Sequence, residues 1–410
     1  MVTKTLTCPG CGCLCDDVEI DLDRDRITQT RNACTKGSTL LYDAQNPERR
    51  TRPLVSGNEV SIDEALEAAA RLLAEAKQPM IFGLDHSTLE TQSLALELAK
   101  KLGAVIDDSS SYTFGSMIEK IITGVLPTCS LDEVKDNADL LLYWGADPPH
   151  THPRHLSTFT YYAYSDYTEA GWFPKVTMSC ISNCENEFTG MCRPVFIVEP
   201  GEDKLLIASI LSHLNGIDST TDATALVEMI RNASFCTIFC GVDLIRSVNN
   251  DLDAFTEMVQ LLSQSTRMAV IPMIEEPNLR GFNQLLHQKT GSINDVDFTD
   301  GQIHATSLPF NERVATQPAD CALIIGADPS SMLPRSMVQS LQYGAVICLD
   351  HFITPNSQAA DIVIPTGLPG LESAGTAISM DGEERTLIKA RDTGYISESE
   401  ALKQLMEKLL

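Results

Sequence analysis

The amino-acid sequence predicts an α/β protein built from parallel strands and covering helices. Its 410 residues are 43% hydrophobic and 6% aromatic, the composition of an ordinary soluble chain with room for two or three packed domains. Short apolar segments alternate with helical segments along most of the chain, which is typical of β-α units. A set of turn residues also occurs twice at one spacing. Together these observations favour two related Rossmann-like domains behind a small N-terminal cap.

Helix boundaries are marked by capping residues. Ser61 and Glu64 form a capping box that opens one helix, and Gly103 ends the next. The expected helices cover 63–77 and 88–102. The expected strands cover 18–22, 80–83, 104–106, 140–144, 195–198, 235–239, 268–271, 323–325, 345–349 and 362–364.

The charge balance excludes two classes of partner. Lys and Arg total 30 against 56 Asp and Glu, giving a net charge of −26. Such a surface repels phosphate backbones and anionic lipids, so neither nucleic acid nor a membrane is expected as a partner. The chain shows no signal-peptide segment and no run near the ~20 apolar residues that span a bilayer. A cytoplasmic location is therefore expected.

An internal repeat is the most informative feature of the organisation. The first copy is Ala138-Asp139, Gly145-Ala146-Asp147-Pro148 and Pro153-Arg154, and the second is Ala319-Asp320, Gly326-Ala327-Asp328-Pro329 and Pro334-Arg335, at a constant offset of 181 residues. Each copy puts a Gly after an apolar strand, where open α/β sheets bind phosphate-bearing ligands. The candidate cofactor-binding residues are Gly145, Asp147, Arg154, Gly326, Asp328 and Arg335.

A later strand in each half ends near an acid, Glu199 in the first and Asp350 in the second, at a position that often binds a ribose. A plain strand-to-helix turn, without any ligand, is the alternative interpretation of each copy of the repeat.

Four cysteines near the N-terminus have the spacing of a metal site. Cys8, Cys11 and Cys15 come from one short loop, and Cys34 follows after eighteen residues. Three soft ligands from one loop and a fourth from elsewhere suit a [4Fe-4S] cluster. Structural zinc and an unmetallated remnant are the alternatives. The surplus thiol of Cys13 could replace Cys11 or Cys15.

Two further groups of possible ligands are ambiguous. Cys180, Cys184 and Cys192 offer three thiols, which are either metal ligands or scattered buried side chains. His150, His152 and His155 cluster beside the first turn, and polar contacts explain them better than metal ligation does.

Motifs at both ends resemble the molybdopterin-dependent oxidoreductases. They are the cysteine set with Cys34-Thr35-Lys36-Gly37, Arg52-Pro53-Leu54, Ala360-Asp361-Ile362-Val363-Ile364-Pro365 and Leu371-Glu372-Ser373-Ala374-Gly375-Thr376. Within that superfamily, Tyr143-Trp144-Gly145-Ala146-Asp147-Pro148, His152-Pro153-Arg154-His155, Gly375-Thr376-Ala377 and Met380-Asp381 are similar to the B subunit of formylmethanofuran dehydrogenase. The resemblance implies the first three domains of a formate-dehydrogenase-type fold.

The resemblance also implies cofactors and partners. In the family, tungsten or molybdenum held by two molybdopterin guanine dinucleotides interconverts carbon dioxide and formate. The cysteine cluster passes electrons to the pterin, and Lys36 lies between them. An A-type amidohydrolase subunit condenses formate with methanofuran, and C-type and D-type subunits complete the complex. The D-type subunit supplies a fourth domain that this chain lacks.

One family feature is altered. The family places a metal-binding Cys and a catalytic His after the second strand, where residues 111–116 here read Ser-Tyr-Thr-Phe-Gly-Ser. Thr113 and Phe114 therefore occupy the Cys and His positions. A free thiol has a pKa of ~8.5 and is readily held as thiolate by a metal, whereas a threonine hydroxyl is a far weaker acid. Phe114 cannot titrate, so no confident catalytic residue is predicted.

The expected function combines these points. The retained scaffold resembles the bacterial formyltransferase/hydrolase complex, in which formyl groups pass from tetrahydromethanopterin to a methanofuran-type carrier and leave as formate. The alternatives are an active molybdenum or tungsten subunit that interconverts carbon dioxide and formate, and an iron-sulfur electron carrier. The expected domains are 1–55 as cluster cap, 56–190 and 191–350 as Rossmann-like domains, and 351–410 as a return segment packing on the first.

Overall fold

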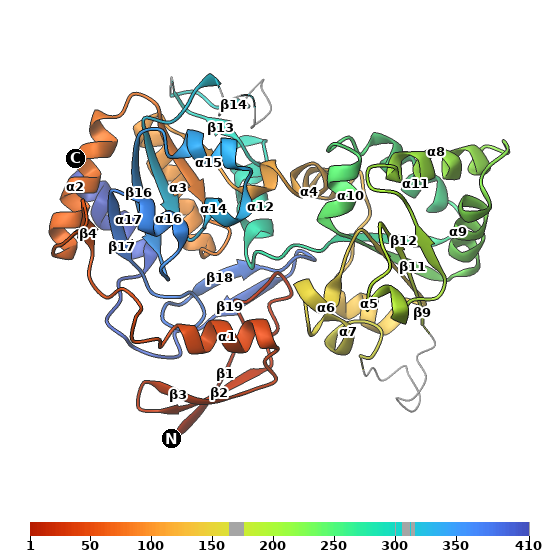
Figure 1. Cartoon of the computed structure of the whole chain (residues 1–410), viewed down its shortest axis with the longest axis horizontal. Helices are drawn as coiled ribbons and strands as arrows, with labels where there is room; N and C mark the ends of the chain where they lie inside the picture. Colours follow the sequence, from red (N-terminus) through yellow and green to blue (C-terminus); the bar gives the residue numbers. More distant parts are fainter. Residues whose placement is uncertain (164–175, 300, 306–311, 313–315, 410) are drawn as a thin grey trace. The chain divides into compact units, whose positions relative to one another are not determined.

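The chain folds into two compact units, shown in Figure 1. The structure is a computed structural model that describes residues 1–163, 176–299, 301–305, 312 and 316–409. Unit 1 comprises Met1–Tyr112, Glu276–Ser379 and Glu384–Leu410, and unit 2 comprises Thr113–Glu275 and Met380–Glu383. Both units contain a sheet of parallel strands with helices, so the α/β class is confirmed.

Unit 2 contains a five-stranded, fully parallel sheet in the order β10-β9-β8-β11-β12. Its strands are β8 (Leu140–Trp144), β9 (Thr177–Ser182), β10 (Val195–Ile197), β11 (Phe235–Cys240) and β12 (Arg267–Pro272). Its helices are α4 (Gly115–Ile122), α5 (Leu131–Asn137), α6 (Pro148–Thr151), α7 (His155–Thr158), α8 (Asp203–Leu214), α9 (Thr221–Asn232), α10 (Val242–Ser247) and α11 (Asp253–Leu262), with a 3-10 turn η2 at Thr189–Met191.

Unit 1 contains a nine-stranded sheet in the order β14-β13-β7-β6-β15-β16-β17-β4-β5. The central parallel strands are β6 (Pro79–Gly83), β7 (Val105–Asp107), β15 (Cys321–Ile325), β16 (Ala345–Asp350) and β17 (Ile362–Pro365). Antiparallel edge strands are β4 (Leu54–Val55), β5 (Asn58–Glu59), β13 (Val296–Asp297) and β14 (His304–Ala305).

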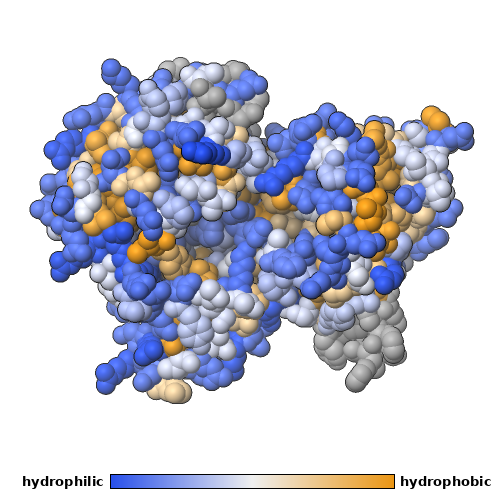
Figure 2. Space-filling model, in the orientation of Figure 1, coloured by the Kyte–Doolittle hydropathy of each residue, from blue (hydrophilic) through white to orange (hydrophobic). Residues whose placement is uncertain are grey.

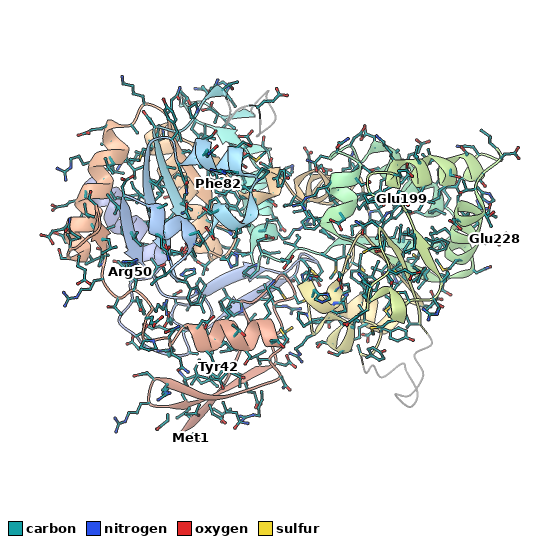
Figure 3. The ribbon with its side chains drawn as sticks, in the orientation of Figure 1. Met1, Tyr42, Arg50, Phe82, Glu199 and Glu228 are labelled. Carbon is teal, nitrogen blue, oxygen red and sulfur yellow. The ribbon has the colours of Figure 1, made fainter. Side chains whose placement is uncertain are left out.

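Helices cover both faces of the unit 1 sheet because its central strands are apolar on both sides. In β6, Ile81 joins the core formed with α2 (Ile62–Glu75), α3 (Leu89–Leu102) and α17 (Glu398–Lys408). The neighbouring Met80 and Phe82 point into the opposite core, and Phe82 is labelled in Figure 3. The remaining helices of this sheet are α12 (Leu279–Thr290), α14 (Pro329–Met332), α15 (Arg335–Leu341) and α16 (Pro355–Ala359), with a 3-10 turn η1 at Ser109–Ser111.

The strands of the two sheets have the same spatial order, but the chain forms them in a different order in each sheet. Register matches β8, β9, β10, β11 and β12 of unit 2 with β15, β16, β17, β6 and β7 of unit 1. In unit 2 the strands are consecutive, whereas unit 1 begins with β6 and β7 and adds the other three much later. The unit boundaries therefore do not coincide with the expected divisions at 190 and 350, because long-range strand pairing places β6 and β8 in different sheets.

The N-terminal segment folds on the side of unit 1. It contains the antiparallel strands β1 (Val2–Leu6), β2 (Val18–Asp23) and β3 (Arg26–Arg31), followed by helix α1 (Thr35–Asp43). It packs on the hairpin of β18 (Gly375–Ile378) and β19 (Glu384–Leu387), where Leu14 joins a small core with Ala377 and Leu387. The cap is thus part of unit 1.

Most expected elements are present. Strands occur at every expected position, and α2 and α3 have the predicted caps: Ser61 and Glu64 form the capping box, and Gly103 ends α3 with a φ of 62°. Strand β9 was not expected. Its residues, Thr177–Ser182, lie between the expected strands at 140–144 and 195–198.

Strand β9 also corrects the pairing of Glu199 with Asp350. Since β9 is the counterpart of β16, the position matching Asp350 is Ser182, at the end of β9. Glu199 instead follows the edge strand β10 and is exposed (Figure 3). Only Asp350 of this pair ends a central strand, so Glu199 is not its structural equivalent.

No helix of the described chain is long and apolar enough to cross a membrane. Hydrophilic residues cover most of the face seen in Figure 2, with apolar patches between them.

Candidate functional site

The candidate metal ligands lie on a tight loop between β1 and β2. The amide of Cys8 donates to the carbonyl of Cys15 (2.8 Å), and the amide of Leu14 donates to that of Cys11 (3.1 Å). Leu14 closes the turn with a φ of 44°, in the left-handed region. The side chains of Cys8, Cys11 and Cys15 are buried, and Cys34 lies at the N-cap of α1.

The sulfurs of Cys8 and Cys34 both lie near Gly37, where an added Cβ would be 2.7 Å from Cys8 Sγ and 3.8 Å from Cys34 Sγ. Burial raises the pKa of the Cys8 thiol well above its usual range, and the charges of Cys11, Cys15 and Cys34 raise it further. A bound metal would oppose this shift by holding the thiols as thiolates. Thiolates are suitable ligands for soft metal ions, and the assignment of these four cysteines as ligands stays a prediction.

Two glycines make room for Cys8. A Cβ on Gly10 would lie 3.2 Å from Cys8 Sγ, and one on Gly37 would lie 2.7 Å from it. The Gly37 amide also donates to Cys34 Sγ at 3.4 Å. The start of α1 thus approaches the loop closely enough that a side chain at position 37 would displace a sulfur.

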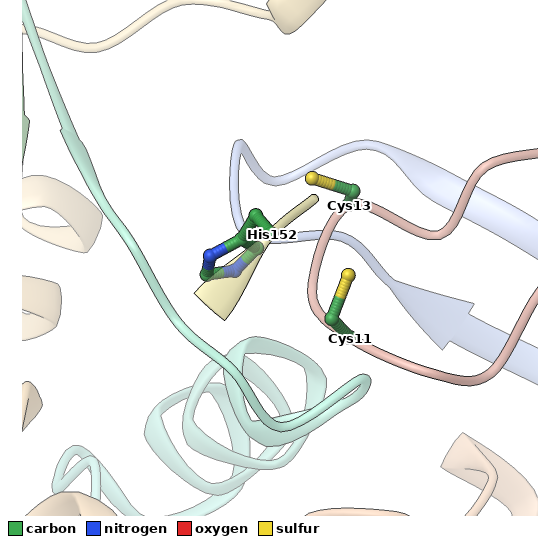
Figure 4. A group of neighbouring side chains, drawn as sticks. All are labelled: Cys11, Cys13 and His152. Atoms are coloured by element: carbon green, nitrogen blue, oxygen red, sulfur yellow. The ribbon is translucent and has the colours of Figure 1, made fainter. Parts of the chain in front are cut away.

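Cys13 is the fourth thiol of this loop and an alternative metal ligand. Figure 4 shows its side chain together with that of Cys11, and their sulfur atoms lie within 4.8 Å of each other. Cys13 is 2% exposed, no more than its neighbours. Burial does not separate Cys13 from the other three loop thiols, and its sulfur lies close to that of Cys11, so Cys13 stays an alternative ligand.

Lys36 lies in the first turn of α1 and faces the loop after β6. Burial and then the Lys36 charge lower the pKa of His86 to about 4. Two side chains hold the backbone of the loop that contains His86. Gln92 Nε2 donates to the Leu84 carbonyl (2.9 Å), and Asn278 Nδ2 donates to the Ser87 carbonyl (2.6 Å). No sequence pattern pointed to this loop, because its contacts come from distant segments.

The two copies of the repeat have the same local structure. Gly145 follows β8 with a φ of 61°, and Gly326 follows β15 with a φ of 54°. Each is followed by a helix of four residues, α6 or α14, whose N-cap is Asp147 or Asp328. A positive φ at both positions explains why glycine occurs there twice.

The aspartates that open each copy also perform the same task. Asp139 accepts hydrogen bonds from the amides of Ser234 (2.8 Å) and Phe235 (2.9 Å) at the start of β11. Asp320 accepts them from the amides of Lys77 (2.8 Å) and Gln78 (2.9 Å) before β6. Since β11 and β6 are counterparts, the repeat is structural as well as sequential.

The other predicted cofactor-binding residues surround these turns. Arg154 is the N-cap of α7, and Arg335 is the first residue of α15 and is exposed. Asp350 ends β16, where its Oδ2 accepts a hydrogen bond from Thr354 Oγ1 (2.7 Å). Burial raises the pKa of Asp350 to about 6.

Thr113 and Phe114 lie where the chain passes from unit 1 to unit 2. Phe114 is 4% exposed and precedes helix α4, so its ring is part of the packed interior. Thr113 is half-buried. The Phe114 side chain offers neither a ligand atom nor a titratable group.

The histidines beside the first turn make polar contacts within unit 2. His150 Nδ1 lies 2.9 Å from Asp147 Oδ2, and His152 Nε2 lies 2.7 Å from the Ile274 carbonyl. His155 Nε2 lies 3.1 Å from the Tyr143 hydroxyl. Each contact engages one ring nitrogen, and the structural role of the histidines stays a prediction.

The three downstream cysteines separate. Cys180 and Cys192 are buried, and Cys192 Sγ donates to the Phe188 carbonyl (3.5 Å), whereas Cys184 is exposed. The arrangement is that of a buried thiol pair with one sulfur at the surface.

The fold and the cysteine loop define the class of protein: an α/β chain with duplicated parallel sheets and a candidate metal-cluster loop at its N-terminus.

No protein-family model matches the chain. It is 32% identical to the B subunit of the tungsten-containing formylmethanofuran dehydrogenase 2 of Methanocaldococcus jannaschii, covering 100% of this chain and 98% of the relative. The corresponding protein of Methanococcus maripaludis is 29% identical, with coverage of 100% and 99%. The chain belongs to the family of formylmethanofuran dehydrogenase B subunits.

A more distant similarity leads to a second complex. The B subunit of the formyltransferase/hydrolase complex Fhc of Methylorubrum extorquens is 23% identical over 80% of this chain and 88% of the relative. The crystal structure of that complex, FhcABCD with methylofuran, matches with a TM-score of 0.71 and 20% identity over 87% of this chain and 98% of that chain. This structural likeness establishes a shared fold.

Proposed function

We propose that this chain is the B subunit of a formylmethanofuran dehydrogenase-like complex that handles one-carbon units as formyl groups on a methanofuran-type carrier. Full-length similarity to two formylmethanofuran dehydrogenase B subunits supports the proposal. Its partners are then A-type, C-type and D-type subunits. The net charge of −26 favours partner surfaces that carry basic residues.

We further propose that the chain is chiefly a scaffold without a redox-active tungsten or molybdenum ion. The observation that carries this proposal is Phe114, a buried phenyl ring in the place of the family's catalytic His, beside Thr113 in the place of its Cys. A hydroxyl and a phenyl ring offer neither a thiolate to the metal nor a group that moves a proton. The residues present do not fit a catalytic metal held in the family's way.

The alternative is an active subunit that interconverts carbon dioxide and formate. It is favoured by the higher identity to the tungsten-containing dehydrogenases, 32% against 23% for the Fhc relative. On that alternative another donor replaces the thiolate. The two functions differ in metal content and redox activity, so both are directly measurable.

The cysteine loop fits a [4Fe-4S] cluster in either case. Cys8, Cys11, Cys15 and Cys34 would be its ligands, and the cluster would supply one-electron transfer. In the same proposal the turns at Gly145 and Gly326, with the acids and arginines around them, bind the phosphates and riboses of the two pterin dinucleotides. The position of both glycines directly after a central parallel strand supports this assignment, because open α/β sheets bind such ligands at the carboxyl ends of their strands.

The test is the metal content and activity of the purified complex. The scaffold proposal expects iron without stoichiometric tungsten or molybdenum, and no formate oxidation with a viologen dye. Tungsten or molybdenum near one per chain, together with dye reduction, would overturn it and establish the active alternative. An isolated chain that is stable alone and transfers electrons between dyes would instead identify an electron carrier.

A double variant tests the two altered positions. Thr113→Cys with Phe114→His, produced with tungstate or molybdate present, is expected to increase retained metal relative to the wild-type complex. The matched control is Thr123→Cys, which places a thiol on an exposed residue at the end of the same helix α4. An equal gain in the control would show that the added thiol binds metal nonspecifically.

A further inference from the structure

Three polar side chains with no role in the proposed function meet at the carboxyl ends of strands in unit 1. Ser87 follows β6, His351 follows β16, and Glu398 opens helix α17. Their exposed fractions are 0%, 5% and 2%. His351 Nε2 lies 3.3 Å from Glu398 Oε1. Ser87 and Glu398 are 311 positions apart in the sequence, so the three residues meet only in the folded chain.

The polar atoms of this group depend on one another. Ser87 Oγ, His351 Nε2 and both carboxyl oxygens of Glu398 form no hydrogen bond of ordinary geometry within the described parts of the chain. Buried polar atoms are nearly always satisfied, so four such atoms in one place must satisfy each other or a shared small molecule. A solvent molecule with several polar neighbours is compatible with that requirement.

The group lies directly against the turn at Gly326. A Cβ on Gly326 would be 2.8 Å from Glu398 Oε1 and 2.9 Å from Ser87 Oγ. Both oxygens therefore pack on the Gly326 Cα, and no larger residue fits there. The conformation of the turn after β15 depends on where these two side chains are held.

We propose that Ser87, His351 and Glu398 share one proton and form a positioning site that fixes the turn at Gly326. One proton assignment satisfies all three side chains. Glu398, as a neutral acid, donates its O–H to His351 Nε2, and Ser87 donates to the other carboxyl oxygen. His351 then donates from Nδ1 to Thr366 Oγ1, which lies 3.1 Å away.

The surrounding charges favour this assignment over an ion pair. Burial and then the nearby Asp350 raise the pKa of Glu398 to about 8. Burial, then Arg49 and His86, lower the pKa of His351 to about 3. Asp350 disfavours a negative charge on Glu398, and Arg49 disfavours a positive charge on His351. An ion pair between Glu398 and His351 is therefore unfavourable.

The other copy of the repeat lacks this group. Strand register places Leu244 at the position of Ser87 and Asn183 at the position of His351. There, a Cβ on Gly145 would meet the Leu244 backbone at 2.7 Å instead of a carboxyl group. The two turns are alike in backbone conformation, but the turn in unit 1 packs on a carboxyl oxygen and a hydroxyl, whereas the turn in unit 2 packs on the backbone and the Asp243 Cβ at the start of α10.

The sign of the pH dependence follows from the retained proton. Between the unperturbed pKa of 4.5 and the folded value of about 8, the folded chain holds a proton that the unfolded chain has released. Stability therefore falls as pH rises through this window, and the unfolding constant rises by up to tenfold per pH unit from this one group. Below pH 4.5 the contribution is fully present.

Glu398→Gln in the full chain tests the proposal. Glutamine keeps the shape, donates to His351 and accepts from Ser87, but does not titrate. The wild-type unfolding constant is expected to rise relative to that of Glu398→Gln by up to tenfold per pH unit between about pH 5 and pH 8. Glu400→Gln is the matched control, because Glu400 lies two residues further along the same helix and is exposed. This control should follow the wild-type curve.

A second measurement reports the proton itself. At pH 6 the infrared difference between wild type and Glu398→Gln should contain the carbonyl band of a protonated carboxylic acid. Parallel stability curves, or a difference spectrum with only carboxylate bands, would overturn the proposal and assign an ion pair instead. If Glu398→Gln does not fold, Ser87→Ala should shift the same band by removing a hydrogen bond to Glu398. An unshifted spectrum would then overturn the proposal.

Discussion

The guanidinium group of Arg49 lies 2.7 Å from the Glu372 carboxylate in a buried ion pair that joins positions 323 residues apart. The two side chains are 3% and 0% exposed. Arg49 also donates to the carbonyls of His351 (2.5 Å) and Thr366 (2.8 Å), and its guanidinium lies 4.2 Å from the ring centroid of Tyr395. Arg49, near the end of the N-terminal cap, thus satisfies polar groups in the two loops that follow β16 and β17 of unit 1.

Arg49→Met is expected to destabilise unit 1 by about 3–5 kcal/mol, because it leaves the Glu372 carboxylate buried without its partner. Urea denaturation of wild type and variant measures the difference. The matched control is Arg52→Met, which removes an exposed contact of 3.6 Å to Glu59. Surface ion pairs contribute little, so the control should unfold like the wild type. Equal effects in both variants would contradict a special role for the buried pair.

Cys8→Ser is expected to remove most of the bound iron, because Cys8 is a predicted ligand whose buried sulfur lies against Gly10 and Gly37. Iron and inorganic sulfide per chain are the measurements, with about four irons expected for an intact cubane. Cys13→Ser should keep its iron if the predicted ligand set is correct. The reverse result, with iron lost only from Cys13→Ser, would show that Cys13 has taken the place of another loop ligand.

Gly37→Ala separates crowding of the cluster site from loss of the helix. Alanine favours a helix over glycine by roughly 0.5–1 kcal/mol, so α1 should form at least as well. Its Cβ, however, would lie 2.7 Å from Cys8 Sγ and displace the sulfur. We expect reduced iron content with an unchanged circular dichroism spectrum. Gly190→Ala has open space around its Cβ and is the control; full iron content in Gly37→Ala would refute the crowding argument.

Asp139→Asn and Asp320→Asn test whether the two copies of the repeat do the same work. Each carboxylate accepts two backbone amides, and asparagine turns an N–H group toward one of them. Each variant should lose about 0.5–1.5 kcal/mol of stability, the usual net contribution of a hydrogen bond, because these amides are partly accessible to water. Asp136→Asn, on the exposed side of α5, should show no such loss. A loss in only one of the two variants would indicate that the copies have diverged.

The predictions from sequence succeeded where the signal is local. Capping at Ser61 and Gly103 is visible because a helix end is decided by a few neighbouring residues. The buried strands are visible because an apolar run must be covered on both faces. Strand β9 was missed because its residues, Thr177–Ser182, alternate small, polar and sulfur-containing side chains, and its burial comes from its neighbours β8 and β10.

The same difference between local and long-range signals applies to the candidate site. The cysteine spacing pointed to a metal loop, since three ligands from one loop need only short-range geometry. The roles of Gly37 and Asn278 were not predictable, because each acts on a segment that is distant in sequence. Gln92 also donates to the distant Asn278 carbonyl (3.0 Å). The mismatch between Glu199 and Asp350 has the same origin: strand neighbours in a parallel sheet are chosen by long-range pairing.

By itself, the sequence of this protein determined the repeated strand-turn unit, the helix ends and the thiol-rich loop, because each depends on residues within a few positions of one another. Only the tertiary structure decided that one copy of the sheet begins at a different strand from the other, and that Arg49 meets Glu372 while Glu398 meets His351. These contacts depend on burial, because the charged or protonated groups interact strongly only after distant segments have packed together and excluded water.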